Sequence, residues 1–166
     1  MRKVVILEGC DGSGKTTLAG ALTRRRGYSY SVVKTGPPVP GYDVAVAYLD
    51  EIYAALARLG RTLFDRLHLG EKIYGPLLRG EDRMGRDGLA TIERVMATHD
   101  VSLIICCPPW DTLVASWRSK DDLLKNETQV RHVYDAYLCE AVRLGITPYD
   151  WTAPNAEEIL KGLIEI

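Results

Sequence analysis

Residues 9–16 read Gly9-Cys10-Asp11-Gly12-Ser13-Gly14-Lys15-Thr16 and match the phosphate-binding pattern G-x-x-x-x-G-K-[ST]. Residues 4–7 before them form an unbroken apolar run, which is typical of a strand buried on both faces. Residues 16–26 after them carry apolar side chains at helical spacing. A glycine-rich turn that binds nothing requires neither neighbour. We therefore interpret the motif as a nucleotide-phosphate loop between a strand and a helix.

The loop is expected to bind phosphate through both its backbone and its side chains. Its glycines allow a tight bend that turns N–H groups inward, where they and the positive end of the helix hold phosphate oxygens. Lys15 is expected to reach the β- and γ-phosphates, and the Thr16 hydroxyl to bind Mg²⁺. The predicted nucleotide-binding residues are Asp11, Gly12, Ser13, Gly14, Lys15, Thr16 and Thr17.

Length, charge and cysteine content narrow the class of protein. The 166 residues are expected to form one domain, 1–166, with its own core. A formal net charge of -1 gives no attraction to nucleic acid or to an anionic membrane, so we expect small-molecule nucleotides as partners. No apolar run approaches the roughly 20 residues of a membrane span, and the four cysteines are expected as reduced thiols without metal. We expect a cytoplasmic protein, and a homodimer is compatible with the sequence.

Predicted strands and helices alternate along the chain. Beyond the first strand, strands are predicted at residues 28–35, 61–65, 101–107 and 146–151, with amphipathic helices between them. This alternation predicts an α/β fold with a parallel, doubly wound sheet of about five strands.

Several residues occupy positions where a helix is expected to begin or end. Pro76 is expected to kink or end the helix that contains it. Asp87 and Asp111 are expected to cap the helices that follow them. Asn126 followed by Gln129 is a capping pair, which predicts the start of a long helix.

Charged residues follow the second and third predicted strands. Lys34 and the pair Asp65-Arg66 lie at carboxyl ends of strands, and in open α/β sheets that edge faces the ligand. Lys34 therefore either meets an anionic substrate or is a solvated surface lysine. Asp65 and Arg66 are further candidates for the site.

Residues 117–127 form a charged segment between two predicted helices, and we interpret this segment as a lid. One of three cations is expected to reach a transferred phosphoryl group from it: Arg118, Lys120 or Arg131. Each of the three is alternatively a solvated surface charge.

Two motifs taken together resemble those of the thymidylate kinase family. Glu8-Gly9-Cys10-Asp11-Gly12-Ser13-Gly14-Lys15-Thr16-Thr17 is similar to the family's E-G-x-D-G-x-G-K-[ST]-T loop, and Phe64-Asp65-Arg66-Leu67-His68 is similar to its D-R-[YH] motif. In element order the resemblance covers residues 3–149, and it is closest to the short, divergent, phage-type members. It implies a P-loop NTPase three-layer sandwich, with a five-stranded parallel sheet in the order 2-3-1-4-5 flanked by helices.

The resemblance also implies a reaction, the ATP-dependent transfer of a phosphoryl group to a deoxynucleoside 5'-monophosphate. It implies that Lys15 and Thr16 serve the ATP phosphates and Mg²⁺, that Asp65 supports the metal or its waters, and that Arg66 holds the acceptor phosphate. The candidate catalytic residues are Lys15, Asp65, Arg66 and Arg118, and the candidate metal site is Thr16 with Asp65.

The sequence departs from the family's pattern where the base would bind. Leu67 takes the third position of the second motif, Glu71-Lys72-Ile73-Tyr74-Gly75 stands in place of an Ala-Tyr-Gln string, and Lys34-Thr35-Gly36-Pro37 in place of Arg-Glu-Pro-Gly. The acceptor is therefore dTMP, dGMP or a modified pyrimidine monophosphate. Aromatic rings stack on any base, whereas hydrogen-bond donors choose among bases. The candidate substrate-binding residues are Lys34, Tyr42, Arg66, His68, Tyr74 and Arg79.

Other functions fit the phosphate loop less well. A deoxynucleoside kinase needs a carboxylate base for a neutral hydroxyl, and only Asp65 is placed for that role. A kinase acting on nucleic acid lacks the expected basic surface. A GTPase would carry Asn-Lys-x-Asp, which is absent from the sequence. A nucleotide-binding regulator without transfer activity remains as an alternative from another class of protein.

Overall fold

The computed structural model describes residues 2–24, 30–34, 41–119 and 123–165. Its four parallel strands follow the order β2-β3-β1-β4. The strands are β1 (Val4–Glu8), β2 (Tyr30–Lys34), β3 (Arg61–Asp65) and β4 (Val101–Ile105). The helices are α1 (Lys15–Arg24), α2 (Val44–Ala57), α3 (His68–Arg79), α4 (Gly85–Thr98), α5 (Trp110–Arg118), α6 (Glu127–Leu144) and α7 (Ala156–Glu165).

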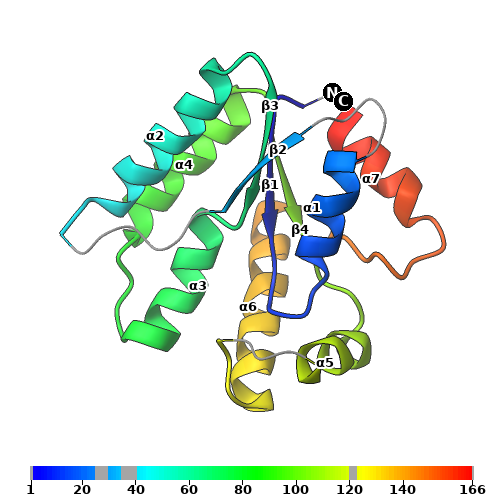
Figure 1. Ribbon diagram of the computed structural model, residues 1–166. Helices are drawn as coiled ribbons and strands as arrows, with labels where there is room; N and C mark the ends of the chain where they lie inside the picture. Colours follow the sequence, from blue (N-terminus) through cyan, green and yellow to red (C-terminus); the bar gives the residue numbers. More distant parts are fainter. Residues whose placement is uncertain (1, 25–29, 35–40, 120–122, 166) are drawn as a thin grey trace.

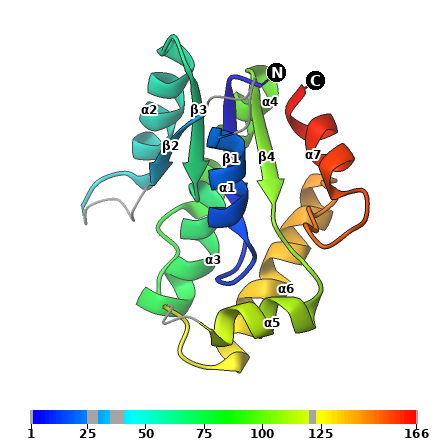
Figure 2. The ribbon, with the colours of Figure 1, turned by 45° about the vertical axis from the view of Figure 1, so that its right-hand side comes forward.

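Strand β1 lies at the centre of a three-layer arrangement. Val4 and Ile6 face a core shared with α2, α3, α4 and α6, whereas Val5 and Leu7 face a second core shared with α1 and α7. Figures 1 and 2 show α1 and α7 on one side of the sheet, with α2 and α4 on the other. Because successive side chains of a strand point to opposite faces, an unbroken apolar run fills both cores. The predicted fold class is confirmed.

The prediction of a fifth full strand at residues 146–151 is wrong. Residues 146–151 contribute one parallel bridge, in which Tyr149 pairs with Cys106 at the edge of the sheet beyond β4. On one side of Tyr149, the Ile146 N–H still bonds the end of α6. On the other side, the Asp150 carboxylate accepts the Thr152 N–H at 2.8 Å and turns the chain. These two contacts leave too few extended residues for a longer ladder.

Three of the predicted helix boundaries, at Pro76, Asp87 and Asp111, differ from those in the structure. Pro76 does not end α3, which continues to Arg79 and stops at Gly80 in a left-handed conformation (φ 77°). Asp87 lies inside the first turn of α4, where the capping role falls to Asp82, whose carboxylate accepts the N–H groups of Met84 and Gly85.

The other two capping predictions had different outcomes. Asp111 lies within α5, which begins at Trp110 after Pro109 and has no side-chain cap. The Asn126 prediction is confirmed, since its side chain accepts the Gln129 N–H at 2.9 Å at the start of α6.

Four cysteines are free, and three of them, Cys10, Cys106 and Cys107, are buried. Burial raises the pKa of the Cys106 thiol to about 12, so it stays protonated at neutral pH. No helix in the described part of the chain has the length and apolar character needed to cross a bilayer.

Candidate active site

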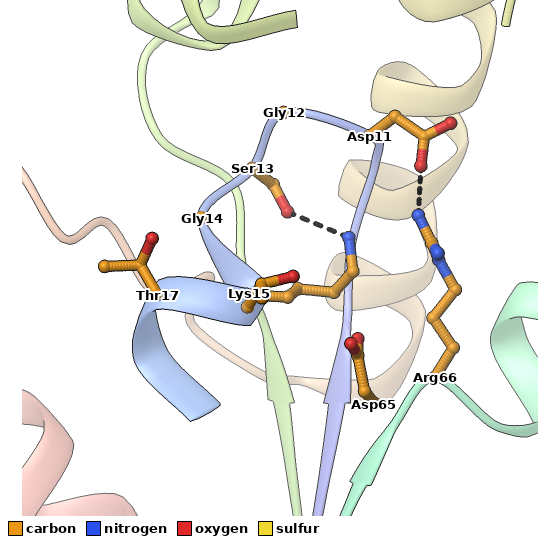
Figure 3. A pocket seen from close by; sticks show the side chains of 9 residues that line it. Asp11, Gly12, Ser13, Gly14, Lys15, Thr17, Asp65 and Arg66 are labelled. Atoms are coloured by element: carbon orange, nitrogen blue, oxygen red, sulfur yellow. Dashed lines mark hydrogen bonds and ion pairs between the residues drawn. The ribbon is translucent and has the colours of Figure 1, made fainter. Parts of the chain in front are cut away.

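A pocket of about 310 Å³ opens where the loop after β1 meets the carboxyl end of β3 (Figure 3). The loop enters from one side, and Asp65 and Arg66 enter from the other. The pocket is lined by Asp11, Gly12, Ser13, Gly14, Lys15, Thr16, Thr17, Asp65 and Arg66. The structure thus places both sequence motifs at one cavity, although they are about 50 residues apart.

The glycines of the loop are required by close contacts as well as by backbone conformation. A Cβ at Gly9 (φ 142°) would overlap the backbone carbonyl of Cys106, and a Cβ at Gly14 (φ 90°) would lie 2.6 Å from Trp151 Nε1. Trp151 Nε1–H donates to the Ser13 carbonyl at 3.1 Å. The segment between α6 and α7 therefore braces the loop, a contact that the sequence analysis missed because no local pattern links the two segments.

The Lys15 side chain lies under the loop, with only 5% of the residue exposed. Its Nζ donates to the carbonyls of Gly9 and Cys10, both at 2.8 Å. It also donates to Ser13 Oγ at 3.3 Å, the bond drawn in Figure 3. All three partners are acceptors, which fits an ammonium with three protons. Burial lowers the Lys15 pKa, and the nearby Arg66 charge adds to this effect.

Arg66 approaches the pocket from a strained turn after β3. Among the described residues other than glycine, it alone has a positive φ, at 70°. Its backbone N–H bonds the Leu7 carbonyl at 2.9 Å, and its guanidinium forms an ion pair with Asp11. The guanidinium carbon also lies 5.3 Å from the centre of the Tyr74 ring. Arg66 is therefore held in position by groups from β1, the loop and α3.

Tyr74 links α3 to the phosphate loop. Its hydroxyl accepts the Asp11 N–H at 3.1 Å, and 6% of the residue is exposed. Asp11 is also buried, and its Oδ2 has no hydrogen-bond partner within the described residues. The structure therefore places the Tyr74 ring beneath Arg66, with its hydroxyl directed to the loop.

Thr16 and Asp65 provide the oxygen ligands that Mg²⁺ prefers. Thr16 and Asp65 are both among the residues that line the pocket. Mg²⁺ in nucleotide sites is typically held by one or two such groups together with phosphate oxygens and water. The donor set therefore fits the predicted metal.

Lys34 and Tyr42 lie outside the lining of the pocket. Lys34 is exposed at the end of β2 and stands opposite Asp65 in the register of the sheet. Tyr42 is 60% exposed, just before α2. Residues 35–40 between them lie outside the described part of the chain.

His68 and Arg79 have positions set by other contacts of α3. His68 is fully buried, and neither ring nitrogen has a hydrogen-bond partner among the described residues. Burial lowers the His68 pKa to about 4. Arg79 forms an ion pair with the buried Glu71, which also accepts from Arg83 Nε at 3.2 Å. Neither His68 nor Arg79 is among the residues that line the pocket.

Two of the three cations expected to act from the lid are engaged with nearby carboxylates. Arg118 pairs with Glu127 at 2.5 Å across the segment, and both side chains are largely exposed. Arg131 pairs with Asp135 on α6 at 2.9 Å and lies over the Trp110 ring, 4.9 Å from its centre. The third candidate, Lys120, lies outside the described residues.

Glu8 and Tyr137 bond to each other close to the site but do not line the pocket. Tyr137 on α6 donates its hydroxyl to Glu8 Oε2 at 3.0 Å, and both residues are buried. Burial raises the pKa of Glu8, while hydrogen bonds from the Leu67 and Gly70 N–H groups and from Tyr137 act in the opposite direction. Glu8 stands in the quoted motif, but nothing in its sequence context predicted these partners.

Solved structures with a similar fold cover almost the whole chain. The YorR protein from Bacillus subtilis, in complex with phosphorylated GDP, has a TM-score of 0.69 at 20% identity, covering 98% of this chain and 94% of that one. Deoxyadenosine kinase from M. mycoides with bound dCTP has a TM-score of 0.59 at 17% identity, with coverage of 98% and 100%. The same kinase with products dCMP and dCDP has a TM-score of 0.62 at 15% identity, again with coverage of 98% and 100%.

No protein-family model matches the chain, and no match is found among curated proteins. At these identities the solved structures show a shared fold. The chain shares its architecture with these solved structures, and its glycine-rich loop lies at the carboxyl end of the central strand.

Proposed function

We propose that this protein transfers the γ-phosphoryl group of ATP to the phosphate of a deoxynucleoside 5'-monophosphate. One observation carries this proposal. Lys15 and Arg66, from motifs far apart in the sequence, line opposite sides of one pocket that also contains Asp65 and Thr16. Two cationic side chains facing one small, polar cavity suit a reaction in which two phosphate groups must be brought together.

The transfer itself needs little acid–base help from the protein. A phosphate monoester has a second pKa near 6, so its oxygen is already ionised at neutral pH. That oxygen attacks the γ-phosphorus, the bond from the γ-phosphorus to its bridging oxygen breaks, and ADP leaves with the electron pair. Lys15 is proposed to neutralise the donor phosphates and Arg66 to hold the acceptor phosphate in line. Bound at Thr16 and Asp65, Mg²⁺ supplies further neutralisation of phosphate charge.

Arg118 of the lid is proposed to neutralise negative charge on the transferred phosphoryl group. Arg118 begins the segment at the end of α5, and its ion pair with Glu127 is exposed to solvent. Exposed pairs contribute about 0–1 kcal/mol, so exchanging Glu127 for a phosphate group costs little. An arginine supplied within the same chain contributes about 10³-fold or more in analogous phosphoryl transfers.

A deoxynucleoside kinase is the second candidate function. Two carboxylates, Asp11 and Asp65, line the pocket, and either one is a base for a 5'-hydroxyl. The deoxyadenosine kinase with similar architecture adds weight to this alternative. The Asp11 carboxylate, however, is already engaged in an ion pair with Arg66.

Acceptor competition tests the proposal directly. The purified protein is given ATP, Mg²⁺ and an equimolar mixture of dTMP, dUMP, dGMP, dCMP and dAMP, and in parallel the matching deoxynucleosides. We expect diphosphate products from dTMP or dGMP in this mixture, and a modified pyrimidine monophosphate is assayed separately as the third expected acceptor. Tyr42 and Arg79 are the proposed base contacts. Phosphorylation of the deoxynucleosides but not of the monophosphates would favour a deoxynucleoside kinase. ATP binding without any transfer would indicate a regulator.

A further inference from the structure

Glu8 is a residue of the phosphate-loop motif to which the proposed reaction gives no role. It ends β1 and is completely buried. Its Oε1 accepts the backbone N–H groups of Leu67 at 2.9 Å, Leu69 at 3.1 Å and Gly70 at 3.2 Å. Its Oε2 accepts the Tyr137 hydroxyl at 3.0 Å. Since every one of these partners is a donor, the arrangement is that of an ionised carboxylate.

Glu8 supplies the cap that α3 does not have in its own sequence. The first N–H groups of a helix have no partner within the helix, and Leu67 at the N-cap position makes no side-chain bond to them. The Glu8 carboxylate satisfies them from a position 59 residues earlier in the chain. A negative charge at this end of a helix is also favoured by the helix dipole.

Arg66 depends on the same first turn. It directly precedes the N-cap of α3, and its left-handed backbone persists only when its surroundings fix it. A Cβ placed on Gly70 would lie 3.5 Å from Arg66 Cβ and 3.5 Å from Glu8 Oε2, so the three groups lie together. The Arg66 N–H bonds the carbonyl of Leu7, the residue before Glu8. The end of β1 therefore holds both sides of the turn.

We propose that Glu8 is a positioning residue for the acceptor: its carboxylate fixes the first turn of α3 and thereby holds Arg66 in the phosphate pocket. The identity of the ligand at Arg66 rests on the proposed function, whereas the placement of Arg66 by Glu8 does not. The phosphate loop keeps its own bonds from Lys15 to the carbonyls of Gly9 and Cys10. Loss of Glu8 should therefore impair acceptor binding more than ATP binding.

Three substitutions at Glu8 separate reach from charge. Glu8→Gln keeps an oxygen for the three N–H groups and should raise the dissociation constant of the acceptor by no more than about 3-fold. Glu8→Asp keeps the charge but withdraws the carboxylate by about one C–C bond, ~1.5 Å, out of reach of the amides. It should weaken acceptor binding about 10-fold or more, while ATP binding changes less than about 2-fold. Glu8→Leu should resemble Glu8→Asp.

Two ligand-free measurements keep this test independent of the proposed function. Amide exchange of residues 67–70 should be faster in Glu8→Asp than in the wild type, and unchanged in Glu8→Gln. Modification of Arg66 by phenylglyoxal, followed by mass spectrometry, should be several-fold faster in Glu8→Asp, since a partly freed guanidinium is more accessible. Arg118, already exposed, serves as the internal reference and should react at the same rate in every variant.

Tyr137→Phe is the gentler variant in case Glu8→Asp and Glu8→Leu fail to fold. It removes one bond to Oε2 and should speed exchange at residues 67–70 without loosening the phosphate loop. Unchanged exchange and unchanged Arg66 modification would overturn the proposal. Parallel loss of ATP and acceptor binding, with faster exchange throughout the chain, would also overturn it, because Glu8 would then only stabilise the fold. A wild type that phosphorylates no monophosphate would overturn the proposed function, and the ligand-free measurements would still decide the role of Glu8.

Discussion

The two sides of the phosphate pocket are built from contacts of very different range. On the donor side, Lys15 bonds carbonyl groups five and six residues away within one loop. On the acceptor side, Arg66 pairs with Asp11, 55 residues earlier, and the turn that carries it is held by Glu8 from β1. The bonds of Lys15 on the proposed donor side are local, although Trp151 also contacts this loop from far along the chain, whereas the proposed acceptor side exists only when β1, β3, α3 and α6 are assembled.

This difference implies unequal resistance to perturbation. A local loop closes at a small cost in chain entropy, whereas contacts between distant segments are lost when any element that carries them opens. Changes near α3 should therefore affect acceptor binding first. Substitutions in the phosphate loop should lower the rate of phosphoryl transfer most. The following predictions test this contrast.

The largest effect is expected from Lys15→Ala. Removing the ammonium from the donor side should lower kcat/KM about 10³-fold or more, because the charge on the transferred group is no longer neutralised. Circular dichroism and thermal unfolding should show that the variant folds. Lys161→Ala changes an exposed lysine of α7 and should leave the rate unchanged. Retained activity in Lys15→Ala would contradict the assignment of the loop as the donor site.

Acid should lower the stability of the fold through His68, a buried residue of α3. The folded protein holds the His68 pKa at about 4, against an ordinary value of 6.5, so the unfolded chain takes up a proton first as the pH falls. The free energy of unfolding should therefore fall by about 3 kcal/mol between pH 6.5 and pH 4. The groups that face His68 are Glu93, Glu140, Arg143 and Lys72.

Urea unfolding at several pH values measures the effect of His68. His68→Leu should flatten the dependence of stability on pH in this window, because the titrating ring is gone. His132→Leu removes a solvent-exposed histidine and serves as the matched control, in which the slope should persist. An equal slope in wild type and His68→Leu would show that another group causes the loss.

Arg66→Ala should weaken acceptor binding about 10- to 150-fold, the value of a charge-assisted phosphate contact of about 1.5–3 kcal/mol. The KM of the monophosphate should rise and kcat should fall, while ATP binding measured alone changes little. Arg66→Lys keeps the charge near Asp11 and should lie between the wild type and Arg66→Ala. Arg86→Ala, at an exposed position, is the control. Unchanged acceptor affinity in Arg66→Ala would identify Arg66 as a structural ion pair.

The smallest effect on stability is expected at the lid. Arg118→Ala breaks an exposed ion pair and should change the free energy of unfolding by less than about 1 kcal/mol, while lowering kcat. In the wild type, a two-substrate mimic should slow hydrogen exchange in residues 117–127, since the lid closes over both phosphates. The reference is the mimic's effect on α7. Exchange in the lid that stays the same with and without the mimic would refute closure.

The proposed donor half of the site could be predicted because the residues that form it are consecutive in the sequence. The glycine positions, Lys15 and Thr16 form a contiguous motif, and the apolar run of β1 fixes where that motif stands in the sheet. The third-strand motif also predicted that Asp65 and Arg66 lie at the same edge of the sheet as the loop, and both residues line the pocket.

The supporting contacts were not predictable from sequence patterns. Glu8 and Tyr137, 129 residues apart, meet only because α6 packs against the end of β1. Trp151 braces the loop from a segment that reads as a strand but turns at Asp150 after a single bridge. A histidine at position 68 was expected to donate a hydrogen bond to the base, but the packing of α3 buries its side chain.

The sequence by itself determined the alternation of strands and helices, the phosphate loop and the strand ends that carry the charged residues. These features depend on side-chain periodicity and on neighbours within a few residues, so they can be recognised without the fold. Only the tertiary structure decided which buried groups hold Arg66, how far the sheet extends beyond β4 and which residues of α3 reach the pocket. Those outcomes depend on packing and on hydrogen bonds between segments far apart in the chain, and a local pattern does not encode them.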